Sequence, residues 1–136
     1  LNEQFLSQVS SIIEENISNT DLSVDFIVKQ MHISRSGFFA KIKTQVDVTP
    51  NDLIQIIRLK KAASLMLQDR YLVSEICYMV GFRNPSYFSK CFHKQFGVTP
   101  IDFIKNHHKS AEEEKNISEE EHDTKETTHP YDSAPE

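Results

Sequence analysis

A predicted helix that begins near residue 85 carries hydroxyl and basic groups on one side only. With about 100° of rotation per residue, its polar side holds Ser86, Ser89, Lys90 and His93, and its opposite side holds Phe88, Cys91, Phe92 and Gln95. Hydroxyl groups hydrogen-bond to base edges, and cations neutralise phosphates. This composition is typical of a helix that packs on its apolar side and contacts a nucleic acid on the other.

An earlier predicted helix repeats this arrangement with a more apolar outer side. Its outer half holds Ser36, Phe39, Ala40 and Lys43, and its inner half holds Phe38, Lys41, Ile42 and Gln45. Phe39 has two open interpretations: it touches thymine methyl groups or sugars, or it covers a neighbouring helix. Lys41 lies at the edge of the inner half, so we expect its ammonium group to reach outward.

Both helices belong to a unit that occurs twice in the chain. Val24, Ile27, Met31 and Ile33 return 49 residues later as Val73, Ile76, Val80 and Phe82. Further matches follow at an offset of 50 residues, at Ser86, Phe88, Phe92, Gln95, Val98, Thr99, Pro100, Asp102 and Ile104. Each copy is predicted to form a short helix, a tight turn and a second helix, which is a helix-turn-helix. An α-solenoid is disfavoured because such arrays need about three or more repeats.

Turn residues mark the boundaries of these helices. Gly81 is expected to end the short helix of the second copy in the left-handed conformation. Asn84 is expected to cap the next helix, with Pro85 at its first position. In the first copy His32 takes the place of Gly81, since His tolerates a positive φ, and Ser34 is the expected cap.

One long predicted helix joins the two copies. Thr49 and Pro50 mark its start as cap and first residue, and residues 50–67 would span about 27 Å at 1.5 Å per residue. Asp47 and Gly97 are expected to close the second helices of the two copies at matched places.

Charge is divided unevenly along the 136 residues. Residues 1–109 contain 13 Lys and Arg against 10 Asp and Glu, whereas residues 110–136 contain 2 against 10. The acidic segment has almost no apolar side chain and cannot bury enough surface to offset the entropy of ordering. We therefore expect an all-α domain over residues 1–109 and a disordered acidic tail over residues 110–136, with a solvated, functionless tail as the simplest interpretation.

Composition narrows the class of protein further. The chain has only 3 Gly and 5 Pro beside 38% hydrophobic residues, which argues against a turn-rich all-β fold. No apolar run approaches the roughly 18 residues needed to cross a membrane, and no signal peptide is visible. Because the chain begins at Leu1 and not at Met, we expect it to be an excised or processed piece of a longer chain.

Other chemistries are disfavoured by the same residues. Cys77 is expected to be a small buried thiol and Cys91 to lie at a face edge, and two cysteines without zinc-type spacing indicate a reducing compartment. His93, His107 and His108 lack the spacing of a zinc site. The Ser and His residues lie without the Gly-rich loops that build a catalytic pocket. We predict no metal, no cofactor and no enzymatic activity for this chain.

Two stretches of the chain resemble one family of transcription regulators. Residues 31–36, Met-His-Ile-Ser-Arg-Ser, with Phe38 and residues 42–43, resemble the first helix-turn-helix of the AraC/XylS family. Residues 80–92 and 95–100 are very similar to that family's signature in the second. The resemblance covers roughly residues 2–106. It implies about seven helices in two subdomains joined by a long linker helix, whose recognition helices enter two adjacent major grooves of double-stranded DNA.

The resemblance also implies which residues face the DNA. The candidates for contact with bases are Ser36, Phe39, Ala40, Ser86, Tyr87, Ser89 and Lys90. The candidates for contact with phosphates are Ser34, Arg35, Lys43, Asn84 and His93. Ala40 and Lys90 stand where the family often has Arg. Because Ala40 cannot hydrogen-bond to a base, it weakens sequence recognition by the first helix. Lys90 offers a single ammonium charge where the guanidinium of an Arg would form two parallel hydrogen bonds.

A narrower similarity concerns the protein around this chain. Residues 86–92 and 1–6 are similar to C-terminal output domains of hybrid two-component regulators in gut Bacteroidetes. This implies an upstream periplasmic sensor, a histidine kinase and a receiver. The full-length protein would be anchored in the inner membrane, and this segment would lie in the cytoplasm at the nucleoid, without membrane contact.

The expected function is sequence-specific regulation of transcription. RNA polymerase, and a second copy joined through the upstream domains, are candidate partners. The alternative is a helical protein–protein interaction module that binds no DNA and uses Phe39 and the acidic tail as contacts.

Overall fold

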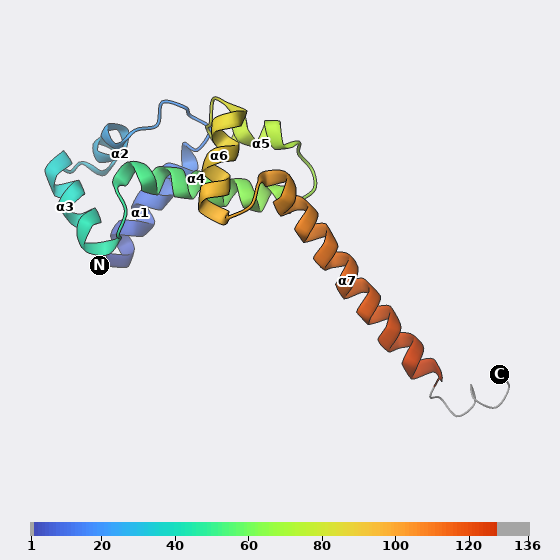
Figure 1. The fold of residues 1–136 in the computed structure, drawn as a ribbon. Helices are drawn as coiled ribbons and strands as arrows, with labels where there is room; N and C mark the ends of the chain where they lie inside the picture. Colours follow the sequence, from blue (N-terminus) through green and yellow to red (C-terminus); the bar gives the residue numbers. More distant parts are fainter. Residues whose placement is uncertain (1, 128–136) are drawn as a thin grey trace. The chain divides into compact units, whose positions relative to one another are not determined.

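The computed structural model describes the backbone of residues 2–127 and the side chains of residues 3–119. The described residues contain no strand and form seven helices: α1 (Asn2–Glu15), α2 (Val24–Met31), α3 (Arg35–Gln45), α4 (Pro50–Met66), α5 (Val73–Met79), α6 (Pro85–Phe96) and α7 (Pro100–Thr127) (Figure 1). The predicted all-α fold is confirmed, with helix-turn-helix motifs at α2–α3 and α5–α6 and the linker helix at α4.

The chain divides into two compact units, of which the first ends at Pro100 and the second begins at Ile101. The first unit contains α1 to α6, and therefore both helix-turn-helix motifs. The domain boundary predicted after Lys109 lies within α7 and stays a prediction.

The first helix-turn-helix is built on α1 and the start of α4. Phe5, Val9 and Ile13 recur every fourth residue on one face of α1, and all three are buried. The ring of Phe38, on α3, lies 5.8 Å from that of Phe5, and Ile54 of α4 joins the same core. Because the inner face of α3 is fixed in this way, its opposite face is left to solvent.

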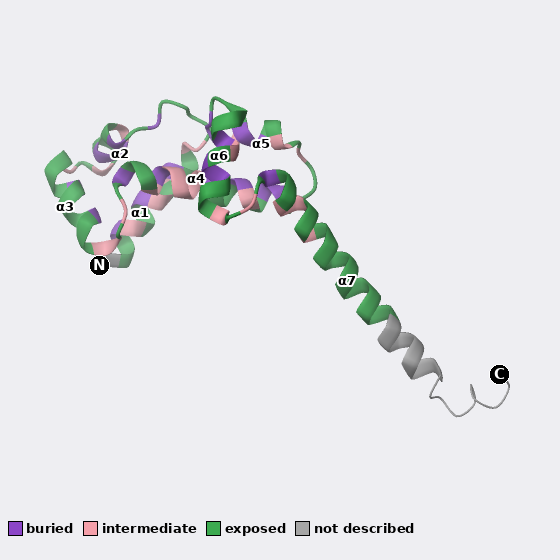
Figure 2. Cartoon of the chain, in the orientation of Figure 1, coloured by how far each residue is buried: buried purple, intermediate pink, exposed green. Residues whose placement is uncertain are grey.

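The second helix-turn-helix packs α5 and α6 against α4 around a row of aromatic rings. Ring centroids are 5.1 Å apart for Phe82 and Phe88, 6.0 Å for Phe88 and Phe92, and 4.6 Å for Phe92 and Phe96. Each such pair stabilises a fold by about 0.5–1.5 kcal/mol beyond the burial of its area. Figure 2 shows buried residues where α4, α5 and α6 face one another. The row holds α6 with its polar side outward.

The predicted turn residues adopt the expected conformations. His32 has φ 56° and Gly81 has φ 90°, so both end their helices in the left-handed region. The side-chain oxygens of Ser34 and Asn84 each accept a 3.0 Å hydrogen bond from the backbone N–H three residues later. Two copies of one turn are therefore present, although one uses His where the other uses Gly.

The ends of the second helices differ between the copies. Gly97 caps α6 with φ 80°, as predicted. The first-copy prediction is wrong for Asp47, because α3 ends at Gln45 and Val46 takes the cap position with an extended backbone. Val46 is β-branched, which favours extended backbone, and it packs partly buried against the first core. Burial of Val46 thus decides how α3 ends.

Helix α7 continues into the acidic tail. The sequence predicts disorder from residue 110 onward, whereas the backbone is helical to Thr127. Every side chain of residues 108–119 is exposed, so no apolar packing holds this stretch of α7. The physical reason is local: the segment is rich in Glu, which favours helix, and it has no Gly and no Pro before Pro130. Residues 128–136 of the predicted tail lie outside the described residues.

None of the helices over residues 2–127 combines the length and the apolar character that crossing a membrane requires.

Candidate nucleic-acid interface

Helix α6 presents its predicted polar side to solvent. Ser86, Tyr87, Lys90 and His93 are exposed, and Ser89 is half-buried. The opposite side is fixed by the buried residues Phe88, Cys91 and Phe92. The five polar residues therefore form a continuous strip along α6 that offers hydroxyl, ammonium and imidazole groups.

Tyr87 is held in a defined position within this strip. Its ring centroid lies 6.1 Å from that of Phe82. A hydrogen bond with the side chain of Cys91, the charge interaction with that thiol and slight desolvation together raise the pKa of the Tyr87 phenol. The phenol keeps its proton at neutral pH and can donate a hydrogen bond.

Helix α3 has a mixed outer side. Ser36, Ala40 and Lys43 are exposed, and Phe39 is 36% exposed. The guanidinium of Arg35 lies 5.0 Å from the centroid of the Phe39 ring. Phe39 is therefore covered on one side by its own helix while part of its ring stays open, so it can still make apolar contact.

Arg35 also forms an ion pair with Asp25 of α2. Their side chains are 58% and 69% exposed, so solvent screens the pair strongly. Pairs of this kind contribute about 0–1 kcal/mol. A phosphate can displace Asp25 from Arg35 at small cost, and Arg35 keeps its place among the phosphate candidates.

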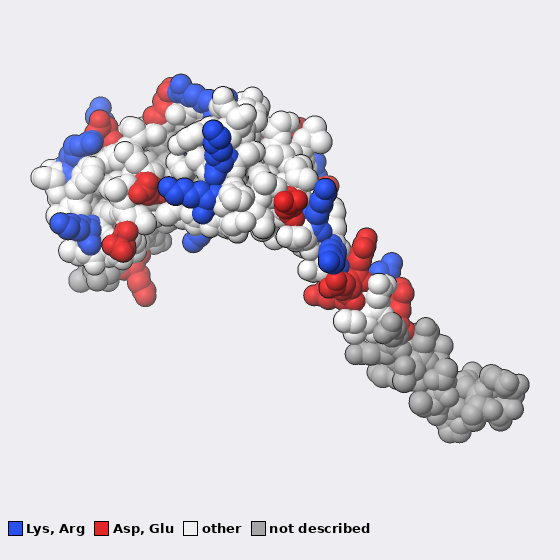
Figure 3. Space-filling view, in the orientation of Figure 1, with Lys and Arg blue, Asp and Glu red and all other residues white. Residues whose placement is uncertain are grey.

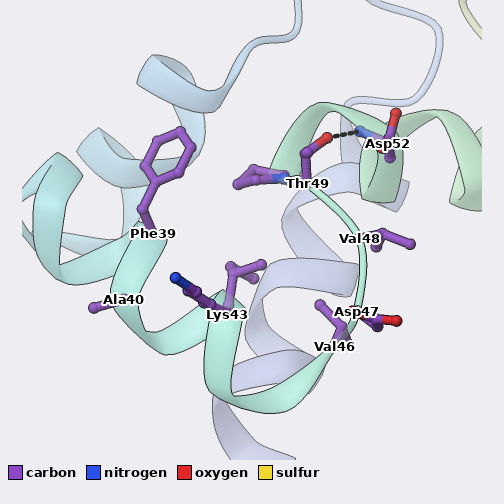
Figure 4. A pocket seen from close by; sticks show the side chains of 10 residues that line it. Phe39, Ala40, Lys43, Val46, Asp47, Val48, Thr49 and Asp52 are labelled. Atoms are coloured by element: carbon purple, nitrogen blue, oxygen red, sulfur yellow. Dashed lines mark hydrogen bonds between the residues drawn. The ribbon is translucent and has the colours of Figure 1, made fainter.

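A groove of about 510 Å³ runs between α3 and the start of α4. In Figure 4, Phe39, Ala40 and Lys43 border it from α3, and residues 46–49 border it from the connecting loop. The Thr49 side chain accepts a 3.1 Å hydrogen bond from the backbone N–H of Asp52, as predicted for the α4 cap. The first recognition helix thus borders a hollow that is suited to apolar groups.

The two capping residues retain hydrogen-bond donors. Ser34 and Asn84 use their side-chain oxygens to cap α3 and α6, which leaves the Ser34 hydroxyl hydrogen and the Asn84 amide able to donate to an oxygen. Both lie at helix N-termini, where backbone N–H groups favour anions. Their surroundings are those expected of phosphate contacts.

The charge division found in the sequence appears on the surface. Figure 3 shows Lys and Arg side chains over the visible face of the first unit, with Asp and Glu side chains between them, and several Asp and Glu side chains along the described part of α7. The small excess of positive charge in residues 1–109 favours contact with a polyanion.

Neither cysteine is placed for surface chemistry. Cys77 is buried as predicted, and its burial raises the pKa of the thiol by desolvation. Cys91 is also buried, deeper than the face edge predicted for it. Cysteines buried in this way are poorly accessible to reagents, so both residues act in packing.

The sequence patterns do not single out Arg58, on α4. Its Nη2 donates a 2.6 Å hydrogen bond to the backbone oxygen of Asn19, 39 residues earlier. The available signal is weak: Arg58 lies between Ile57 and Leu59, but Lys60 and Lys61 follow closely, so it does not stand out as a cation.

Comparison with known proteins identifies the fold. A family model described as a helix-turn-helix domain matches residues 27–106. A transcriptional regulator from Chromobacterium violaceum, described as containing an AraC-type DNA-binding domain, has a similar structure, with a TM-score of 0.71 at 25% identity over 77% of this chain and 93% of that one. The chain belongs to the AraC-type helix-turn-helix family. The predicted resemblance is confirmed.

Relatives of this AraC-type domain include larger regulatory proteins. It is 42% identical over 103 residues to a histidine kinase of Formosa agariphila, covering 76% of this chain and 8% of the kinase. It is 31% identical over 100 residues to the transcriptional activator AggR of Escherichia coli, covering 74% of this chain and 37% of the activator. The chain therefore spans only a minor part of both relatives.

A response regulator provides a further structural likeness. The C-terminal domain of AraT, from Geobacillus stearothermophilus, matches the AraC-type domain with a TM-score of 0.67 at 27% identity, over 74% of this chain and 83% of that one. The fold of this AraC-type domain thus also occurs as the C-terminal part of a two-component protein.

Proposed function

We propose that this AraC-type domain regulates transcription by binding double-stranded DNA with α3 and α6 in two adjacent major grooves. One observation carries the proposal: both helix-turn-helix motifs turn to solvent a side of their second helix that bears Ser and Lys residues, within the same compact unit. Helices of this kind read base edges in the major groove.

The proposed contacts divide into two groups. The residues proposed to face base edges are Ser86, Tyr87, Ser89 and Lys90 on α6, and Ser36, Phe39 and Ala40 on α3. The residues proposed to contact phosphates are Ser34, Arg35, Lys43, Asn84 and His93.

Selection of bound sequences from a random duplex pool tests this function. Enrichment of a site with two contact patches about 10 base pairs apart supports it, since that is the spacing of successive major grooves. A chain that retards no duplex in a gel-shift assay at moderate salt is instead a protein–protein interaction module, which is the alternative function.

We further propose that the domain is the output domain of a hybrid two-component regulator. The likeness to a histidine kinase and to the C-terminal domain of a response regulator supports this placement. In the full-length protein a histidine kinase would lie upstream, with an anchor in the inner membrane, and the DNA-binding domain would act at the nucleoid. RNA polymerase and a second copy, joined through upstream domains, are the proposed protein partners.

The second recognition helix is expected to dominate sequence specificity. Ser89 and Lys90 offer polar contacts to bases, whereas Phe39 and Ala40 offer mainly apolar ones. Loss of a good base contact costs about 1–3 kcal/mol, and a small apolar contact lies at the lower end of that range. Lys90→Ala and Ser89→Ala should therefore reduce the ratio of affinities for the selected and a scrambled site more than Phe39→Ala does.

The comparison of these variants needs intact folding. Circular dichroism checks this for each variant before its affinities are compared. The expectation is wrong if Phe39→Ala abolishes the preference for the selected site while both changes in α6 preserve it.

Removal of the acidic segment is expected to strengthen non-specific binding. Truncation after Lys109 removes ten acidic and two basic residues. We propose that the acidic side chains compete with DNA for the cations of residues 1–109. After truncation, affinity for an arbitrary duplex should rise severalfold at low salt. At physiological ionic strength the screening length is about 8 Å, so salt weakens the attraction between the acidic segment and the cations and the gain in affinity should disappear. The full-length chain with Glu112, Glu113 and Glu114 each changed to Gln is the control of unaltered length. Equal affinities with and without the segment at low salt would show that it is merely solvated.

A further inference from the structure

Three segments that are distant in the sequence meet on one side of α4. They are the connection between α1 and α2, the middle of α4, and the turn between α5 and α6. A polar hollow of about 190 Å³ at this place is lined by all three, through Leu22, Asn51, Ile54, Gln55, Arg58 and Phe82. We name this meeting place the junction. The two helix-turn-helix motifs are linked covalently through α4, and the junction links them a second time through non-covalent contacts.

Arg58 holds the first segment against α4. Its Nη2 donates a 2.6 Å hydrogen bond to the backbone oxygen of Asn19. Its Nε is buried and has no hydrogen-bond partner among the described residues. Half-burying a guanidinium while one of its N–H groups has no partner costs free energy. The hydrogen bond to the Asn19 carbonyl does not remove that cost, because it uses a different nitrogen. It ties the connection to the linker helix.

Gly81 brings the turn between α5 and α6 against the same two partners. A Cβ atom at position 81 would overlap the backbone oxygen of Ile17 and lie 2.9 Å from Nε and Cζ of Arg58. The turn therefore lies in direct contact with the connection between α1 and α2, at Ile17, and with the linker helix. Only a residue without a side chain fits there.

An ion pair closes the junction on its outer side. Arg83, two residues after Gly81, donates a 2.5 Å hydrogen bond from Nη2 to Oδ1 of Asp21. Asp21 lies between α1 and α2, 62 residues earlier. The ion pair is exposed, with side chains 66% and 81% accessible, so its contribution to folding is small. Its position is what distinguishes it, because it links one subdomain directly to the other.

We propose that Asp21, Arg58 and Arg83 are positioning residues that fix the orientation of α6 relative to α3, and thereby the spacing of DNA sites that the domain accepts. This inference rests on the proposed function. A rigid pair of recognition helices tolerates one spacing between its two contact patches. A pair that can rotate about α4 tolerates several.

The test uses the full chain and the duplex enriched from a random pool, with one base pair inserted or removed between its two contact patches. One base pair shifts a patch by about 3.4 Å along the axis and rotates it by about 35°. The unaltered chain should bind the altered duplexes about tenfold or more weakly, because the contacts of one recognition helix are misplaced.

Asp21→Asn and Arg83→Gln should each reduce this spacing penalty about threefold or more, with the enriched duplex bound nearly as well as before. The exchange of both partners, Asp21→Arg with Arg83→Asp, should restore the penalty. Arg58→Lys should behave like the single variants, since a lysine cannot reproduce the guanidinium geometry. Arg70→Gln is the control, because Arg70 is an exposed arginine outside the junction.

Residual dipolar couplings of the free chain give a readout that does not depend on DNA. The unaltered chain should show one alignment for α2–α3 and α5–α6, and the single variants should show two. The proposal is overturned if Asp21→Asn and Arg83→Gln retain the full penalty and a single alignment.

A role of Arg83 as a simple phosphate contact is distinguishable. Arg83→Gln would then weaken all spacings equally while Asp21→Asn would leave the penalty unchanged, and the positioning role would be refuted. If no duplex is enriched by the unaltered chain, the proposed function itself fails and the spacing role fails with it. If a duplex is enriched but the variants keep the full spacing penalty, the proposed function stands and only the positioning role of Asp21, Arg58 and Arg83 is overturned.

Discussion

Replacing Gly81 by alanine is expected to destabilise the AraC-type domain by about 2–5 kcal/mol. Two costs add at this position. The residue has φ 90°, where a side chain costs about 1–2 kcal/mol, and its Cβ would overlap the backbone of Ile17 and crowd Arg58, where overpacking costs about 1–3 kcal/mol. Urea unfolding followed by circular dichroism should show a lower midpoint with an unchanged slope. Since small domains are stable by about 5–15 kcal/mol, the loss is a large share of the total.

Gly97 provides a matched control for this prediction. It has φ 80°, close to that of Gly81, but a Cβ there would meet no atom within 4 Å. Gly97→Ala should therefore cost only the conformational part, about 1–2 kcal/mol. Equal losses at the two positions would show that packing of the turn against Ile17 and α4 contributes nothing.

Binding of the selected DNA is expected to weaken about 10³- to 10⁴-fold when salt rises from 50 to 200 mM. The exposed cations of the two recognition helices, with the N-termini of α3 and α6, are proposed to neutralise roughly 5–8 phosphates, which gives a slope of log affinity against log salt of about −5 to −7. Fluorescence anisotropy with a labelled duplex measures this slope.

Single variants test whether the slope has the proposed origin. Lys90→Ala should make it shallower by about 1 if Lys90 neutralises a phosphate, and should leave it unchanged if Lys90 contacts only a base. Arg70→Gln, outside both recognition helices, should not alter it. A slope shallower than about −2 for the unaltered chain would contradict extensive phosphate contact.

Features set by neighbouring residues in the sequence are predictable from it. The caps at Ser34 and Asn84 depend on residues within one turn, and both are present as predicted. The outward direction of the polar side of α6 follows from helical periodicity together with three inward-facing residues, Phe88, Cys91 and Phe92. Asp47 is predicted wrongly because the neighbouring Val46 is drawn toward the core, which is a tertiary effect that the repeat alone does not reveal.

The parts of the site that escape prediction depend on contacts between distant residues. The contact of Arg58 with Asn19 requires knowledge of which loop returns to α4. The placement of Arg35 between Asp25 and the ring of Phe39 depends on side-chain conformations across two helices. Helix α7 shows the converse. The side chains of residues 110–119 are all exposed, as their composition predicts, whereas local helix propensity decides the backbone conformation.

The two left-handed turns also differ in how much sequence change each copy can absorb. His32 is exposed and bears a side chain at φ 56°, so the first turn accepts any residue that tolerates a positive φ, such as Asn or Gly. Gly81 is buried against other parts of the first unit, and its position accepts only glycine. If the two copies arose by duplication, the residue at position 32 can therefore be substituted during evolution, whereas the residue at position 81 cannot. Exchanging the turns would be asymmetric: Gly at position 32 preserves the fold, and His at position 81 does not.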